Sequence, residues 1–293
     1  MARRILGASG ISVNSIGLGG MPLSISTRPS EEQSIRVICE ALDAGIDLID
    51  TADVYCIDNN DIGHNERLIA KALKEWQGTT AVTIATKGGL VRPNGDWVDD
   101  GRPEHLKSAC EASLIALRVD TIDLYHFHQP DKKVPFDESM GALIELKKSG
   151  KIRNIGLSNA TLEQIIRARE MVEIVSVQDR CSPFDLHHFV DGMVGYCEQN
   201  NIAFMAYSPV GGGNGKMRTE ESQCLNEIAQ HYGATAFQIA LAWLLTKSSV
   251  IIPIPGASRV ENALSSAKAS EIELSKTDTE YLDQELGFSW PNS

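Results

Sequence analysis

The stretch SIGLGGM, residues 15–21, has the pattern of a buried strand, and the residues that end it decide between two folds. In an open, doubly wound sheet that binds a dinucleotide, the first strand runs into a turn of the form G-x-G-x-x-G. The letters GLGG at residues 17–20 do not form that turn. The first strand therefore favours a closed (β/α)8 barrel, provided that the chain supplies eight strands.

The rest of the chain supplies them. Apolar runs of strand length alternate with amphipathic stretches of helix length, and such connections require parallel pairing. The predicted strands are residues 15–21, 45–50, 82–89, 123–128, 152–159, 174–179, 202–209 and 250–256. The predicted helices are residues 30–44, 65–75, 103–117, 138–149, 161–171, 188–199, 220–231 and 235–247. Ser30, Asn65 and Thr161 are expected to cap the helices that they precede.

The two ends of the chain lie outside this repeat. The segment RRILGASGISV, residues 3–13, is expected to form a β-hairpin over one end of the barrel, and residues 270–293 a C-terminal tail. No linker or change of composition divides the sequence. We therefore expect residues 1–293 to form a single α/β domain, a (β/α)8 TIM barrel.

Composition excludes several classes of function. The formal net charge of -12 argues against a general nucleic-acid binder, which needs a basic face. No apolar run is long enough to span a membrane, and the start MARRILGASG lacks the apolar core of a signal peptide. The six cysteines are scattered without a C-x-x-C pair, which indicates reduced thiols. These features predict a cytoplasmic protein that binds neither nucleic acid nor membrane.

Four titratable side chains of different types end three successive predicted strands: Asp50, Tyr55, Lys87 and His128. In a barrel, function gathers at these strand ends. A lysine ammonium beside a phenol favours the phenolate and lowers the pKa of the phenol, while an aspartate holds the lysine charged. A neutral histidine N–H can polarise a carbonyl oxygen. The set suits protonation of an oxygen that becomes negative as hydride reaches the carbon.

These residues lie in segments that resemble the aldo-keto reductase family. The matching segments occur in the family's order: GLGGM, IDTADVY, IATKGG, DLYHFH, KIRNIGLSN, VSVQ, AYSPVGGG and IPGASR. The resemblance covers roughly residues 3–285. It implies a barrel that binds a nicotinamide cofactor, usually NADPH, in extended form. It also implies that Tyr55, with Asp50, Lys87 and His128, acts as the acid in reduction and the base in oxidation.

The resemblance also assigns cofactor contacts by position. The groups expected to hold the nicotinamide and its ribose are Gly20, Met21, Asp50, Ser158, Asn159, Gln178 and the stacking Tyr207. Those expected at the pyrophosphate are Ser208, Pro209, Val210 and Gly212. Those expected around the adenosine 2'-phosphate are Gly256, Ala257, Ser258, Arg259 and Asn262. Ser265 and Ser266 stand where many relatives have a Glu-Asn pair that holds the adenine, so this contact departs from the family pattern. By resemblance we expect NADPH, with NADH less favoured, and Arg259 is the one nearby cation that could select its phosphate.

Several features have two interpretations. His126 shares a strand face with His128, and such a pair could bind metal, but the other strand ends lack further ligands, so we expect no metal. The acidic loop 56–64 is either a solvated rim or a filter against anionic substrates. Trp97 either covers the substrate or packs its own loop.

The sequence therefore predicts a monomer, or a weak homo-oligomer, that reduces a small-molecule aldehyde or ketone to an alcohol with NADPH. One alternative is a cofactor-binding regulatory protein that resembles potassium-channel β subunits. A second is a metal-dependent barrel hydrolase. Substrate specificity is expected in loops 22–30, 56–64, 90–102 and 210–219.

Overall fold

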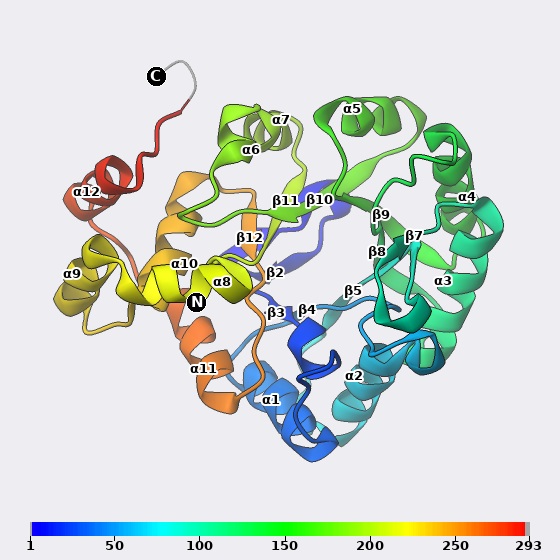
Figure 1. Cartoon of the computed structure of the whole chain (residues 1–293), viewed down its shortest axis with the longest axis horizontal. Helices are drawn as coiled ribbons and strands as arrows, with labels where there is room; N and C mark the ends of the chain where they lie inside the picture. Colours follow the sequence, from blue (N-terminus) through cyan, green and yellow to red (C-terminus); the bar gives the residue numbers. More distant parts are fainter. Residues whose placement is uncertain (1, 291–293) are drawn as a thin grey trace.

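A computed structural model describes residues 2–290, without the side chains of residues 213 and 214. Eight parallel strands form its central sheet, in the spatial order β12-β11-β10-β9-β8-β5-β4-β3 (Figure 1). In chain order these strands are β3 (Leu18–Gly19), β4 (Leu48–Asp50), β5 (Thr83–Gly88), β8 (Ile122–Phe127), β9 (Ile152–Ser158), β10 (Ile174–Arg180), β11 (Ala203–Tyr207) and β12 (Ile251–Pro253). The predicted parallel α/β architecture is confirmed.

The first and last strands meet, which closes the sheet into a barrel. A parallel bridge joins Gly19 to Gly256. The backbone N–H groups of Gly17 and Gly19 donate to the carbonyl oxygens of Pro253 and Pro255, at 2.9 and 3.0 Å. A Cβ atom on Gly19 would lie 2.8 Å from the carbonyl oxygen of Ile254. The GLGG segment is thus glycine-rich because two backbones approach closely at this seam.

Helices surround the strands (Figure 1). They are α1 (Glu31–Asp43), α2 (His64–Glu75), α3 (Pro103–Leu117), α4 (Phe136–Lys148), α5 (Leu162–Met171), α6 (His187–Val190), α7 (Met193–Gln199), α8 (Gly212–Glu221), α9 (Gln223–Tyr232), α10 (Ala236–Lys247), α11 (Val260–Ala269) and α12 (Lys276–Leu286). Ser30 and Thr161 cap α1 and α5, as predicted. Asn65 does not cap α2. It lies inside that helix, and its side chain donates to the carbonyl oxygen of Gly20 at 2.9 Å.

Two predicted helices differ from those observed. The helix expected at residues 188–199 is divided into α6 and α7, because Gly192 has φ +85° and Asp191 accepts a hydrogen bond from the Met193 N–H. The helix expected at residues 220–231 is α9, and α8 precedes it. The C-terminal segment beyond the barrel contains α12, where Leu282 is fully buried.

The predicted N-terminal hairpin is confirmed and closes one end of the barrel. Strands β1 (Arg3–Ile5) and β2 (Ser12–Asn14) pair antiparallel. Leu6 and Val13 are fully buried in the cluster that fills the barrel interior, with residues such as Leu48 and Leu124. At the opposite end a second hairpin, β6 (Leu90–Val91) and β7 (Val98–Asp99), follows β5. The β1–β2 hairpin thus covers the end at which the strands begin, and a site is expected at the other end, where the strands finish.

No helix within residues 2–290 combines the length and the apolar character needed to cross a membrane.

Candidate active site

Three of the four predicted catalytic side chains meet at the ammonium group of Lys87. Its Nζ donates to both carboxylate oxygens of Asp50, at 2.9 and 2.8 Å, and to the hydroxyl of Tyr55, at 2.9 Å. A further bond goes to the carbonyl oxygen of Thr51, at 2.8 Å. Lys87 is fully buried. These contacts fix the ammonium against the phenol with no room for water between them.

Strand register produces this meeting. Asp50 ends β4 and pairs with Ala85 of β5, so Lys87 lies two residues further along β5 and faces the same side. Tyr55 follows β4 in the next loop, where it is buried against the same lysine. The two neighbouring parallel strands thus bring a carboxylate, an amine and a phenol together from positions 37 residues apart or less.

The ionisation of the cluster follows from burial and charge. Burial by itself would lower the pKa of Lys87, but Asp50 and Tyr55 more than offset it, so the pKa stays above its ordinary value. Burial raises the pKa of Tyr55 to about 12, and Lys87 acts in the opposite direction. We predicted a lowered phenol pKa. Lys87 has that effect, but burial outweighs it, and Tyr55 is therefore a protonated donor at neutral pH.

His128 completes the set on the other side of Tyr55. The two ring centroids lie 5.9 Å apart in an edge-on arrangement. Burial and the positive charge of Lys87 hold the pKa of His128 well below its ordinary value, so the ring is neutral. Its buried Nδ1 has no hydrogen-bond partner among residues 2–290, which favours the proton on Nε2. A neutral N–H donor therefore stands beside the phenol.

A long cavity of about 810 Å³ opens beside this cluster. At one end Tyr55, His128 and Trp97 form its wall, and Asn262, Ser265 and Ser266 line the cavity as well. Most of the predicted cofactor contacts line it: Met21, Asp50, Ser158, Asn159, Gln178, Tyr207, Ser208, Pro209, Val210, Gly212, Gly256 and Asn262. Amide, hydroxyl and aromatic groups followed by a glycine-containing loop form a donor set that fits a nicotinamide dinucleotide.

The predicted nicotinamide contacts are linked to the catalytic cluster. Gln178 donates to Asp50 at 2.7 Å. Asn159 donates to the carbonyl oxygen of His128 at 3.0 Å and accepts from the Tyr207 hydroxyl, also at 3.0 Å. Asn159 and Ser208 both have positive φ, at 53° and 51°, a conformation that is uncommon outside glycine. Backbone strain of this kind is concentrated at ligand-binding walls.

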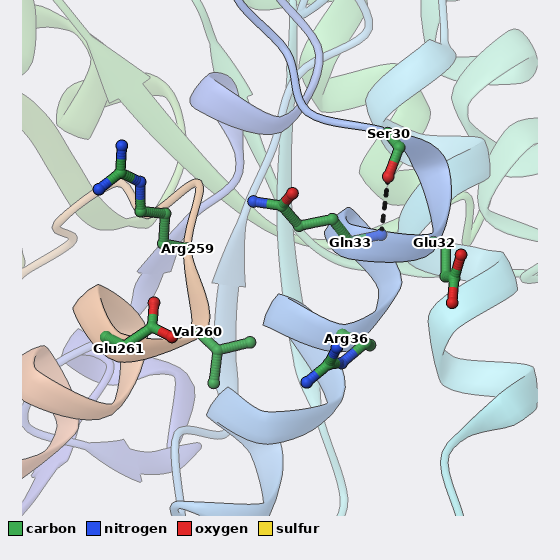
Figure 2. A pocket seen from close by; sticks show the side chains of 7 residues that line it. All are labelled: Ser30, Glu32, Gln33, Arg36, Arg259, Val260 and Glu261. Atoms are coloured by element: carbon green, nitrogen blue, oxygen red, sulfur yellow. Dashed lines mark hydrogen bonds between the residues drawn. The ribbon is translucent and has the colours of Figure 1, made fainter.

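Four predicted cofactor residues do not line this cavity: Gly20, Ala257, Ser258 and Arg259. Arg259 lines a second cavity of about 460 Å³ between α11 and α1 (Figure 2). Gln33 of α1 also lines it and donates to the carbonyl oxygen of Ser258 at 2.8 Å. Arg36 is a second cation there, although Arg259 was expected to be the only one. The two guanidinium groups point away from each other (Figure 2).

Several lining residues were missed from the sequence. Arg180 ends β10, and Lys216 and Glu220 lie on α8. Lys216 falls within the expected loop 210–219, and Glu220 begins the helix expected at residues 220–231. The glycine-rich run before Lys216 gives little helical signal, which explains that omission. The position of Arg180, directly after Gln178-Asp179 at a strand end, was a signal available in the sequence.

The structure also shows the contacts of His126 and of the acidic loop 56–64, for which the sequence left two interpretations each. His126 contacts the Ser176 hydroxyl at 2.7 Å, and within residues 2–290 no group of three or more His, Cys, Asp or Glu residues is arranged to hold a metal ion. In the acidic loop, Asp61 forms an ion pair with Arg28 at 2.5 Å, and Asp58 accepts from the N–H of Asn60. These two carboxylates therefore serve local structure.

A closed parallel barrel with an acid–base cluster at the mouth of a long cleft defines an enzyme scaffold. Residues 15–286 match the sequence profile of the Aldo/keto reductase family, and the chain belongs to this family of oxidoreductases. An uncharacterized oxidoreductase of Schizosaccharomyces pombe is 33% identical over 279 residues, covering 93% of this chain and 87% of the relative.

Solved structures give the same result. A thermostable aldo-keto reductase in complex with the inhibitor epalrestat superimposes with a TM-score of 0.82 and 31% identity, over 97% of this chain and 100% of the other. A glycerol dehydrogenase from Gluconobacter oxydans superimposes with a TM-score of 0.84 and 27% identity, over 97% and 94% of the two chains. The predicted family and its (β/α)8 fold are confirmed.

Proposed function

We propose that this oxidoreductase uses NADPH to reduce an aldehyde or a ketone to an alcohol, with Tyr55 as the general acid. The observation that carries the proposal is the position of Lys87, whose ammonium bonds Asp50 and Tyr55 at once in a fully buried setting. A buried ammonium at 2.9 Å from a phenol oxygen stabilises the phenolate that is left when the proton is given up, and this is what a general acid needs.

Each side chain has a separate task in this proposal. A bound nicotinamide cofactor supplies the hydride, or accepts it in the reverse direction. Tyr55 and His128 both line the cavity, and a carbonyl oxygen there receives the phenol proton and a hydrogen bond from the imidazole. Lys87 stabilises the phenolate that remains, and Asp50 balances the charge of the lysine.

The preference for NADPH belongs to the proposal as well. By resemblance, residues 256–262 lie at the adenosine end, and the cavity beside them is lined by Arg259 and Arg36. A 2'-phosphate is favoured by such cations, whereas a bare hydroxyl gains little from them. The glycerol dehydrogenase among the structural relatives supports an interconversion of alcohol and carbonyl in either direction.

The proposal predicts that Tyr55→Phe loses carbonyl reduction while it keeps cofactor binding. The substitution removes only the hydroxyl, so the rate should fall by about 10²- to 10⁴-fold. Consumption of NADPH with an aromatic aldehyde measures the rate, and quenching of protein fluorescence measures cofactor binding. Tyr196→Phe is the matched control, because its hydroxyl contacts Arg169 on the helical surface, away from the cavity.

Equal rates in the Tyr55→Phe variant and the parent protein would refute the assignment of the acid. If the parent protein binds NADPH but reduces no member of a broad carbonyl panel, the proposed reaction is wrong, and a regulatory cofactor-binding role replaces it.

A further inference from the structure

Arg92 is a buried arginine beside the catalytic cluster, and no step described above uses it. Its side chain lies under Trp97, with the guanidinium carbon 3.7 Å from the centroid of the indole ring. Its Nη2 donates to the carbonyl oxygens of Cys56 and Ile57, at 3.3 and 3.2 Å. Its Nε and Nη1 are buried without a hydrogen-bond partner among residues 2–290.

This arrangement is unfavourable for stability alone. Arg92 is only 6% exposed, and a buried N–H group without an acceptor loses its bonds to water. An apolar side chain of similar size would fill the same space at lower free-energy cost. Besides the two bonds of Nη2, the guanidinium gains the stack on Trp97, a cation–π interaction that strengthens when water is excluded. The stack thus couples the position of Arg92 to that of Trp97.

Trp97 needs such support. It lines the long cavity, yet it is 47% exposed, so packing covers only about half of it. Its ring centroid lies 6.3 Å from that of Tyr55 and 6.4 Å from that of His128, both edge-on. The indole thus stands directly beside the two groups that contact the carbonyl oxygen in the proposed reaction.

Arg92 also ties the segment that carries Trp97 to the loop that follows Tyr55. Its backbone N–H donates to the side-chain oxygen of Asn59 at 2.6 Å, and the Asn59 N–H donates to its carbonyl oxygen at 3.0 Å. Together with the bonds to residues 56 and 57, these contacts brace two loops against each other. A brace of this kind fixes the distance between Trp97 and the catalytic phenol.

We propose that Arg92 is a positioning residue that holds Trp97 as one wall of the substrate pocket, and that this wall selects carbonyl compounds carrying a planar, uncharged ring. The proposal rests on the proposed carbonyl reduction. The cavity lining beside Trp97 includes Leu90 and Gln129, which are apolar or uncharged, and the indole covers the Arg92 guanidinium, so these three described residues offer no exposed cation to a carboxylate or phosphate. Rings pack favourably edge-on against the aromatic walls.

The first test compares two aldehydes at saturating NADPH. With a benzaldehyde, Arg92→Met should raise KM by about 5- to 20-fold and leave kcat within about twofold, because lost binding of the ring is a ground-state effect. With propanal, which has no ring, both constants should match the parent protein. Arg92→Lys keeps the charge but not the planar stack. Its KM for the benzaldehyde should lie between that of the parent protein and that of Arg92→Met.

Arg102→Met is the matched control. Arg102 follows the same hairpin, but it is exposed and pairs with Asp100, with no contact to Trp97. Its kinetic constants should equal those of the parent protein for both aldehydes. An unchanged KM in Arg92→Met, or an equal rise for propanal and benzaldehyde, would overturn the proposal, because selection by a ring wall would then be absent.

A second readout does not depend on turnover. The chain has four tryptophans, and the difference between the parent protein and Trp97→Phe isolates the fluorescence of Trp97. Arg92→Met should make this component more accessible to quenching by acrylamide, and Arg92→Lys less so. If the parent protein reduces no member of a broad carbonyl panel, the proposed function has failed, and quenching alone decides the role of Arg92. Unchanged quenching in Arg92→Met would overturn it.

Discussion

A phenol with a pKa of about 12 donates a proton at neutral pH and accepts one poorly. In the proposed reaction Tyr55 is therefore prepared for reduction, in which it would give a proton to the developing alkoxide. In the reverse reaction it must first lose that proton. Lys87 lowers the free energy needed to remove the Tyr55 proton, since its charge opposes the effect of burial on the pKa of Tyr55. The residue scale thus predicts different pH dependences for the two directions.

Carbonyl reduction should vary little across the neutral pH range, because Tyr55 stays protonated throughout. Alcohol oxidation should rise by about tenfold for each unit of pH on the alkaline side, because the phenolate fraction rises in that way below the pKa. Lys87→Met removes the opposing charge, so the pKa of Tyr55 should rise further and oxidation should weaken more than reduction. Steady-state rates in both directions over a pH series measure this.

Lys107→Met is a suitable control for that series, because Lys107 lies on the surface of α3 and pairs with Glu145. A Lys87→Met variant with the oxidation profile of the parent protein would show that Lys87 does not tune Tyr55.

At the scale of elements, the sequence predicted best a helix whose start carries a clear signal, because Pro103 occupies the first position of α3 and proline is favoured there. The helix α3 has the bounds expected of it, Pro103–Leu117. Helices α11 and α12 were not predicted, because their buried residues are small or few: Ala263 and Ala267 in α11, and Leu282 in α12. A sequence with so few large apolar residues has the pattern of an exposed loop. The sequence does contain a start signal for α12, a serine three residues before an acidic residue. In the structure Ser275 accepts a hydrogen bond from the N–H of Asp278.

Helix α12 packs on the outside of the barrel against α10 and should contribute to the stability of the fold. The Trp243 indole donates to Asp283 at 2.7 Å, which joins α10 to α12 beside the fully buried Leu282. Leu282→Ala should lower the free energy of unfolding by about 2–5 kcal/mol, through lost apolar burial and a cavity. Urea denaturation measures this. KM for the aldehyde should not change, because α12 contributes nothing to the long cavity.

Lys276→Ala, at an exposed position of the same helix, serves as the control and should leave the urea midpoint in place. A loss smaller than about 1 kcal/mol in Leu282→Ala would mean that α12 is not part of the folded core.

At the scale of the whole molecule, parallel topology was predictable and the shape of the cleft was not. The absence of a G-x-G-x-x-G turn and the eight strand-length runs led to a barrel, and Gly19 of β3 closes it against Gly256. The strand ends also led to the prediction that Asp50, Lys87 and His128 belong to one site. Arg259, in contrast, lies in a separate cavity, and the contact of Arg92 with Trp97 depends on a hairpin that no local pattern specifies. Tertiary packing alone determines such contacts.

The most direct test of the central claim uses NADPH that carries deuterium at its transferable position, with a benzaldehyde as the acceptor. Mass spectrometry of the product follows the label. The account predicts an alcohol that contains one deuterium on its former carbonyl carbon, and almost none of this product with Tyr55→Phe. Bound NADPH that transfers no deuterium to any carbonyl, or labelled alcohol formed equally well by Tyr55→Phe, would contradict it.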